Sequence, residues 1–109
     1  KKGADVGANP KEMQARLRKW YGFVAKENQA TLVPCGDAWE LNYASTAAVR
    51  LHTKDHSHPE FVGTYLNALV FYRVIYQPKD LNVAYRGKAS AAEATRLQGL
   101  AARVPLPPR

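Results

Sequence analysis

The apolar and polar positions along the chain form three main helical patterns, one shorter helical pattern and one short strand-like run. In the first pattern, apolar residues recur every three or four positions from Pro10 to about Asn28, which predicts an amphipathic helix. Asn9 can cap this helix, Pro10 suits its first position, and Glu12 completes an Asn-x-x-Glu capping box. Its apolar face carries Met13, Leu17, Trp20, Tyr21 and Val24.

The run Ala30–Pro34 has the length and composition of a β-strand. It does not alternate between apolar and polar residues, which is typical of a parallel strand buried on both faces. A lone strand leaves its backbone donors and acceptors unpaired, so this one needs neighbouring strands from elsewhere. The sequence therefore predicts an α/β fold in which this chain supplies one or two strands and is itself mainly helical.

Two further capping boxes mark helix starts. Asp37 and Glu40 predict a short helix through Trp39, and Ser90 and Glu93 predict the last helix. The segment between the short helix and Leu51 fits either a further helical turn or an extended lead-in. We expect one domain with no internal boundary, a loop at residues 1–8 and a proline-rich tail at 105–109. The last helix carries one apolar face, formed by Leu97, Leu100, Ala101 and Val104.

The most apolar segment follows Pro59, which suits a first helical turn, and runs to Tyr76, before Pro78 stops it. A helix that is apolar nearly all round is normally buried on several sides, so we expect this one at the centre of the core. The predicted core cluster contains Leu66, Leu69, Val70, Val74, Leu17, Trp20, Tyr21, Val24, Val33 and Leu100.

Asp55 and His58 lie just before this central helix, three residues apart. Histidine has a pKa suited to a general base near neutral pH. A carboxylate bonded to its Nδ1 fixes the tautomer and leaves Nε2 facing a nucleophile. The short loop between the two residues allows both side chains to serve one site. The alternative is structural: Asp55 caps the following turn and His58 is a surface residue.

The pattern D-x-x-H-P, followed by G-T-Y-L-x-A-L-V-F-Y, resembles the last motif block of the SGNH (GDSL-type) hydrolases. The runs P-C-G-D-A-W and L-Q-G-L-A are also similar to that family, so the resemblance extends from about Pro10 to Val104. These hydrolases are serine esterases and acetylhydrolases with a three-layer α/β/α fold. The resemblance implies that Asp55 is the orienting acid and His58 the general base of a Ser-His-Asp triad. It also implies that Gly63, Tyr65 and Leu69 belong to the helix behind the histidine.

The chain departs from the family because it has no Gly-Asp-Ser block for the nucleophile and no middle blocks for the oxyanion hole. We therefore expect the C-terminal part of such a domain, inactive alone and completed by the missing N-terminal part. The implied substrate is an acyl ester of a small molecule or a carbohydrate, with no cofactor. The resemblance makes a periplasmic or secreted location plausible, although the chain shows no signal peptide.

The net charge of +7 permits nucleic-acid binding, but the basic residues are scattered and form no run of five. A non-enzymatic basic helical module remains an alternative, and steep salt dependence of binding to DNA or RNA would identify it. A degenerate hydrolase-like interaction protein is another. Hydrophobic residues are 46% of the chain, yet no apolar stretch is long enough to span a membrane.

Other residue types suggest sites that the sequence supports less well. His52, His56 and His58 form the pattern H-x-x-x-H-x-H, which is not a standard zinc pattern, so we expect no metal. Cys35 follows the strand-like run, where α/β active sites cluster, but no basic or glycine-rich neighbour activates it. The remaining hydroxyl nucleophiles are poorly placed: Ser45, Ser57 and Ser90.

Overall fold

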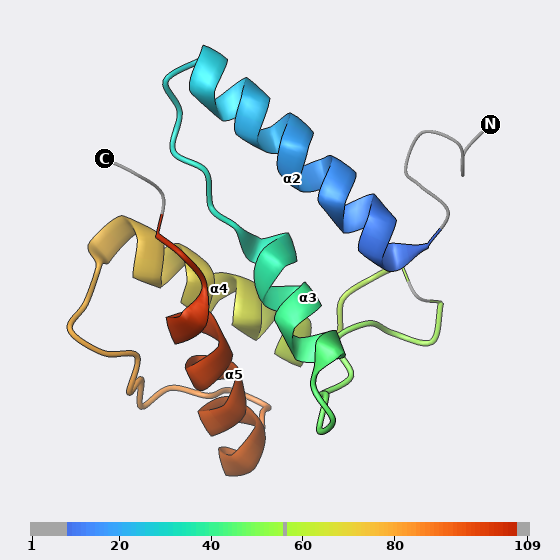
Figure 1. The fold of residues 1–109 in the computed structure, drawn as a ribbon. Helices are drawn as coiled ribbons and strands as arrows, with labels where there is room; N and C mark the ends of the chain where they lie inside the picture. The colour runs from blue at the N-terminus through green and yellow to red at the C-terminus, as the bar shows by residue number, and fades with distance from the viewer. Residues whose placement is uncertain (1–8, 56, 107–109) are drawn as a thin grey trace.

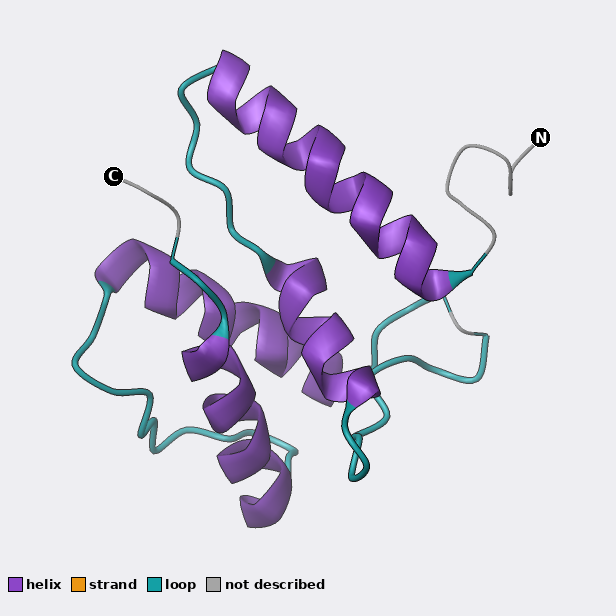
Figure 2. Ribbon diagram, viewed as in Figure 1, coloured by secondary structure: helices purple, strands orange, loops and turns teal. Residues whose placement is uncertain are grey.

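The computed structural model describes residues 9–55 and 57–106. Within them the chain folds into helices joined by loops (Figure 1, Figure 2). The bounds are α2 (Pro10–Glu27), α3 (Cys35–Ala44), α4 (Phe61–Tyr76) and α5 (Ala91–Arg103). α3, α4 and α5 contact one another, whereas α2 contacts only α3. The prediction of a mainly helical chain is confirmed.

The predicted strand at 30–34 does not form. These residues are an extended connection between α2 and α3, and no β-sheet occurs in the described part of the chain. A strand is stable only when its backbone groups pair with a neighbour, and no other described segment lies alongside this one as a strand. The one antiparallel bridge in the described residues joins His52 to Pro59 instead.

The helix starts follow the predicted caps at Asn9 and Ser90, but only Ser90 forms the full predicted box, because the carboxylate of Glu12 binds Arg16 instead. The side chain of Asn9 accepts a hydrogen bond from the backbone N–H of Glu12 at 2.8 Å, at the start of α2. Ser90 and Glu93 form the predicted reciprocal capping box of α5. Both caps depend on residues three apart, so the sequence alone specifies them.

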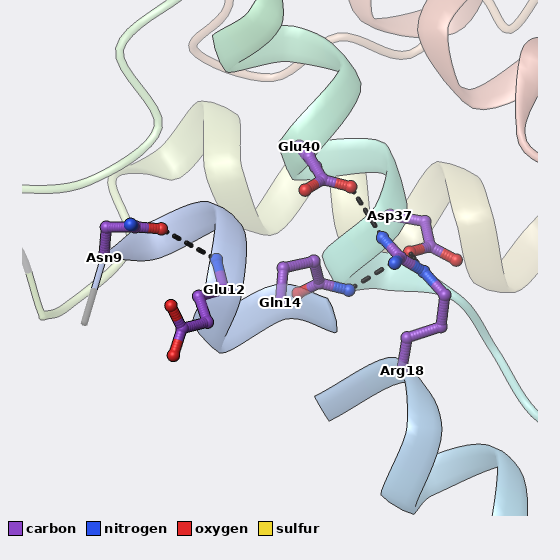
Figure 3. A network of polar contacts seen from close by, with 6 residues as sticks. All are labelled: Asn9, Glu12, Gln14, Arg18, Asp37 and Glu40. Atoms are coloured by element: carbon purple, nitrogen blue, oxygen red, sulfur yellow. Dashed lines mark hydrogen bonds and ion pairs between the residues drawn. The ribbon is translucent and has the colours of Figure 1, made fainter. Parts of the chain in front are cut away.

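The two central helices begin differently from the prediction. α3 begins at Cys35 without a side-chain cap, so the predicted box of Asp37 and Glu40 is wrong. Both carboxylates instead bind Arg18 of α2, at 2.7 Å and 2.6 Å (Figure 3). α4 begins at Phe61 rather than at a proline, because the preceding residues belong to the antiparallel pair described above.

The core lies around α4 and confirms only part of the predicted cluster. Leu66, Leu69, Val70, Val74 and Leu100 are buried, and Val33 is partly buried against them. Of the four predicted core positions on α2, Leu17 is partly buried and the other three are wrong. Trp20 is 56% exposed, Tyr21 63% and Val24 53%, because only the first part of α2 packs against α3. Polar bonds from Gln14 and Arg18 to α3 hold that part (Figure 3).

The segment before Leu51 is an extended loop and not a further helical turn. Asn42, which is fully buried in α3, holds it: its side chain donates to the carbonyl of Val49 at 2.7 Å and accepts from the N–H of Val49 at 3.0 Å. This pairing leads the chain into the loop that carries Asp55 and His58. Among the described helices, none has the length and apolarity that crossing a membrane would require.

Candidate active site

A short antiparallel turn presents Asp55 and His58. The N–H of Thr53 donates to the carbonyl of His58, and the N–H of Glu60 donates to the carbonyl of Leu51, both at 2.7 Å. Leu51 is fully buried, so the base of this turn is fixed to the core. The turn therefore has rigid ends on the N-terminal side of α4.

The Asp55 carboxylate is bonded through both of its oxygens. Oδ2 lies 2.5 Å from Nδ1 of His58. Oδ1 accepts the backbone N–H groups of Ser57 at 2.9 Å and His58 at 3.0 Å, and the hydroxyl of Thr53 at 2.5 Å. Four donors on one carboxylate fix its plane, and with it the orientation of the imidazole ring.

These donors hold the pKa of Asp55 well below its usual range. The hydroxyl of Thr53 contributes most, followed by the backbone N–H and the ring of His58 and then the N–H of Ser57. An ionised carboxylate at 2.5 Å from Nδ1 requires the ring proton on that nitrogen in the neutral imidazole. Nε2 is then unprotonated and able to accept a proton.

The pair faces solvent rather than a closed pocket. The side chain of His58 is 75% exposed and that of Asp55 49%. Within the described part of the chain, no hydrogen bond engages Nε2 of His58. The arrangement can hold and orient an imidazole, but no described residue forms a hydrogen bond with the second ring nitrogen, Nε2.

The structure does not bring any of the considered serines to His58. Ser90 caps α5, and Ser57 gives its backbone N–H to Asp55. The hydroxyl of Ser45 donates to the carbonyl of Asn42 at 2.9 Å and accepts from the guanidinium of Arg96. Among the hydrogen bonds of the described residues, none joins one of these hydroxyls to the imidazole of His58.

Cys35 is also set apart from the pair. Its thiol points towards the carbonyl of Asn67 at 4.0 Å, and burial raises its pKa to about 11. The reactive form of cysteine is the thiolate, so at neutral pH this side chain is an inert thiol. It occupies the start of α3 as a small partly buried residue.

The described residues contain no cluster of three or more potential metal ligands. His52 faces Tyr43, whose hydroxyl lies 3.0 Å from its Nδ1, and its ring packs against Trp39. His56 lies outside the described residues. His52 is therefore engaged by aromatic side chains, whereas His58 is bonded to Asp55.

Sequence reasoning missed one member of the site, Thr53. It lies two residues before Asp55, a spacing at which a short polar side chain commonly bonds within a turn. Its importance becomes visible only once the turn brings its hydroxyl onto the carboxylate.

Comparisons of the chain with protein-family models, with curated proteins and with solved structures gave no significant match. The geometry of the site and the sequence pattern therefore carry the functional argument.

Proposed function

We propose that this chain carries the acid–base half of a serine ester hydrolase active site of the SGNH type. The observation that supports it most directly is the short contact from Asp55 Oδ2 to Nδ1 of His58, with Oδ1 held by three further donors. In this role Asp55 fixes the tautomer, and Nε2 of His58 takes the proton from an attacking hydroxyl. The substrate class is an acyl ester of a small molecule or a carbohydrate.

The nucleophile and the oxyanion donors come, in this proposal, from the N-terminal part of the same domain. The exposure of His58 supports this, since a general base needs a hydroxyl within about 2.6–3.2 Å of its nitrogen. The open side of the imidazole is where that hydroxyl would lie. The chain alone is then half of a site and has no esterase activity.

The exposed apolar faces of α2 and α4 support the proposal that a further segment of the domain packs over them. Soluble proteins rarely leave large contiguous apolar patches open to water, and such patches mark contact surfaces. We propose that a sheet of the complementary segment covers these faces and pairs with residues 30–34, which completes an α/β/α sandwich. The second half of α2 stands clear of α4 in Figure 1, and the two helices make no contact. The exposed side chains are Trp20, Phe23 and Val24 on α2, and Phe71, Ile75 and Tyr76 on α4.

The direct test is complementation. The chain joined to the segment encoded upstream of Lys1 should hydrolyse p-nitrophenyl acetate, while the chain alone should not. In the joined protein His58→Ala should abolish turnover, because the general base is lost. Asp55→Asn should reduce kcat by about 10⁴-fold, because an amide favours the wrong imidazole tautomer.

His56→Ala is the matched control, as a neighbouring histidine outside the pair, and it should retain most activity. Full activity of His58→Ala would refute the assignment of the base. Hydrolysis by the chain alone, lost when Cys35 or a serine is replaced, would refute the claim that the site is incomplete. A joined protein that folds but remains inactive would favour the degenerate, interaction-only alternative.

A further inference from the structure

A second candidate site lies in a cleft between α2 and α3, which we call the α2–α3 cleft. Its volume is about 860 Å³, within the range of small-molecule sites, and neither Asp55 nor His58 lines it. Most of its wall is apolar, formed by Met13 of α2 with Trp39, Leu41 and Tyr43 of α3. The cleft can therefore hold an apolar body against its wall without help from Asp55 or His58.

His52 supplies the first polar group of the cleft, and its ring is held by its neighbours. The N–H of Leu51 donates to the hydroxyl oxygen of Tyr43 at 2.9 Å. The same hydroxyl lies 3.0 Å from Nδ1 of His52 and can donate its proton to that nitrogen. In the neutral tautomer in which Nδ1 accepts from this hydroxyl, the ring carries its own proton on Nε2 and acts there as a donor. Packing against the rings of Trp39, at 4.6 Å, and Tyr43, at 5.7 Å, holds the imidazole in place.

Asn67 and Lys11 add further donors. The side-chain oxygen of Asn67 accepts the indole N–H of Trp39 at 2.8 Å, so the amide nitrogen is the group left to donate. Lys11 lines the cleft from the first turn of α2 and takes part in no ion pair among the described residues. The one acidic residue of the lining, Glu40, is bound to Arg18 at 2.6 Å, and the same guanidinium also binds Asp37 at 2.7 Å.

We propose that the α2–α3 cleft binds a small monocarboxylate with an apolar, preferably aromatic, body. The argument is complementarity: Lys11 offers a cation without an ion pair among the described residues, His52 and Asn67 offer donors, and most of the remaining wall is apolar. The carboxylate would lie towards Lys11 and His52, and the body between Met13 and the aromatic residues of α3. The proposal is independent of the esterase function, since it uses no residue of the acid–base pair.

Binding of 4-phenylbutyrate tests the proposal. For a ligand of this size we expect a Kd of about 1–3 mM. Two-dimensional NMR of the ¹⁵N-labelled chain should show the indole N–H signal of Trp39 shifting to saturation. The indole signal of Trp20, which lies outside the cleft, should remain in place and serves as the internal control. The neutral analogue 4-phenylbutan-1-ol should bind at least about fivefold more weakly, because it lacks the charge.

Three variants locate the site. Ala44→Trp adds a large side chain at an exposed position of the cleft and should abolish binding without disturbing the core. Lys11→Glu should weaken binding at least about fivefold. An acidic residue in the first turn stabilises a helix, so unfolding of α2 would not explain this loss. Lys88→Glu makes the same change in net charge outside the cleft and should bind normally.

If the indole signal of Trp39 does not saturate at a ligand concentration tenfold above the expected Kd, the proposal is overturned. Equal binding of the alcohol, or equal loss in the variants of Lys11 and Lys88, would overturn the role of charge. Unchanged binding by Ala44→Trp would overturn the location. These outcomes leave the esterase proposal unaffected, because that test reads turnover in variants of His58.

Discussion

Replacing Gly63 by alanine tests the contact that positions the acid–base pair. Gly63 is buried in the first turn of α4, and an added Cβ would lie 2.6 Å from the carbonyl oxygen of Leu51 and 2.9 Å from ring carbons of Trp39. That carbonyl already accepts the N–H of Glu60, which closes the turn carrying Asp55. A backbone atom and a packed indole cannot rotate aside, so the turn or the helix must shift.

The expected magnitude follows from two opposing effects. Overpacking a tight site costs about 1–3 kcal/mol. Alanine is favoured over glycine inside a helix by about 1 kcal/mol. Gly63→Ala should therefore destabilise the chain by about 1 kcal/mol. Gly99→Ala in α5 is the matched control, because nothing lies within 4 Å of its added Cβ, and it should stabilise by about 0.5–1 kcal/mol.

Urea unfolding followed by circular dichroism measures both changes through the transition midpoint, provided the slope is unchanged. The two variants should differ by about 2 kcal/mol, with opposite signs relative to the parent. If Gly63→Ala stabilised the chain as much as Gly99→Ala, the close approach of α4 to Leu51 would be wrong. The rigid base inferred for the turn would then be wrong with it.

Two other predictions test the core and the carboxylate. Leu69→Ala should lower the free energy of unfolding by about 2–5 kcal/mol, because this side chain is only 3% exposed. Trp20→Ala should lower it by well under half as much, because its side chain is 56% exposed. Equal losses of stability in urea unfolding would contradict the placement of α2. The pKa of Asp55 is lowered in the folded chain. Its ionised carboxylate therefore stabilises the turn fully at pH values above the unfolded-state pKa of about 3.9, and this stabilisation is lost as the pH falls from there through the folded-state pKa. Thr53→Ala should raise this pKa towards its ordinary range in a ¹³C carboxyl titration, and an unchanged titration would show that the hydroxyl is not the leading donor.

Local sequence was sufficient for features that depend on residues a few positions apart. The caps at Asn9 and Ser90 and the apolar face of α5 follow from spacing alone. The central place of α4 in the core follows from its composition, although one of its apolar faces remains exposed at Phe71, Ile75 and Tyr76. The proximity of Asp55 and His58 is of the same kind, because a three-residue separation in a turn keeps the two side chains within reach.

Long-range contacts decided the features on which the prediction was wrong. The amphipathic pattern of α2 predicts an apolar face but not what covers it, and in the fold only part of that face meets α3. The spacing of Asp37 and Glu40 predicts a capping box, but in the fold Asp37 binds Arg18. Arg18 lies nineteen positions away, so the local pattern contains no information about this contact. The run at 30–34 has strand composition, but a strand also requires a neighbour, and local sequence cannot supply one.

The sequence by itself determined which residues form the candidate base and its acid, and which helix lies at the centre of the core. The tertiary structure decided how rigid and how exposed the pair is, because Thr53 and the closure of the turn on Leu51 depend on the folded path of the chain. It also decided that Lys11, His52 and Asn67 line one cleft. Periodicity records which face of each segment is apolar, whereas the meeting of segments far apart in sequence depends on packing between them.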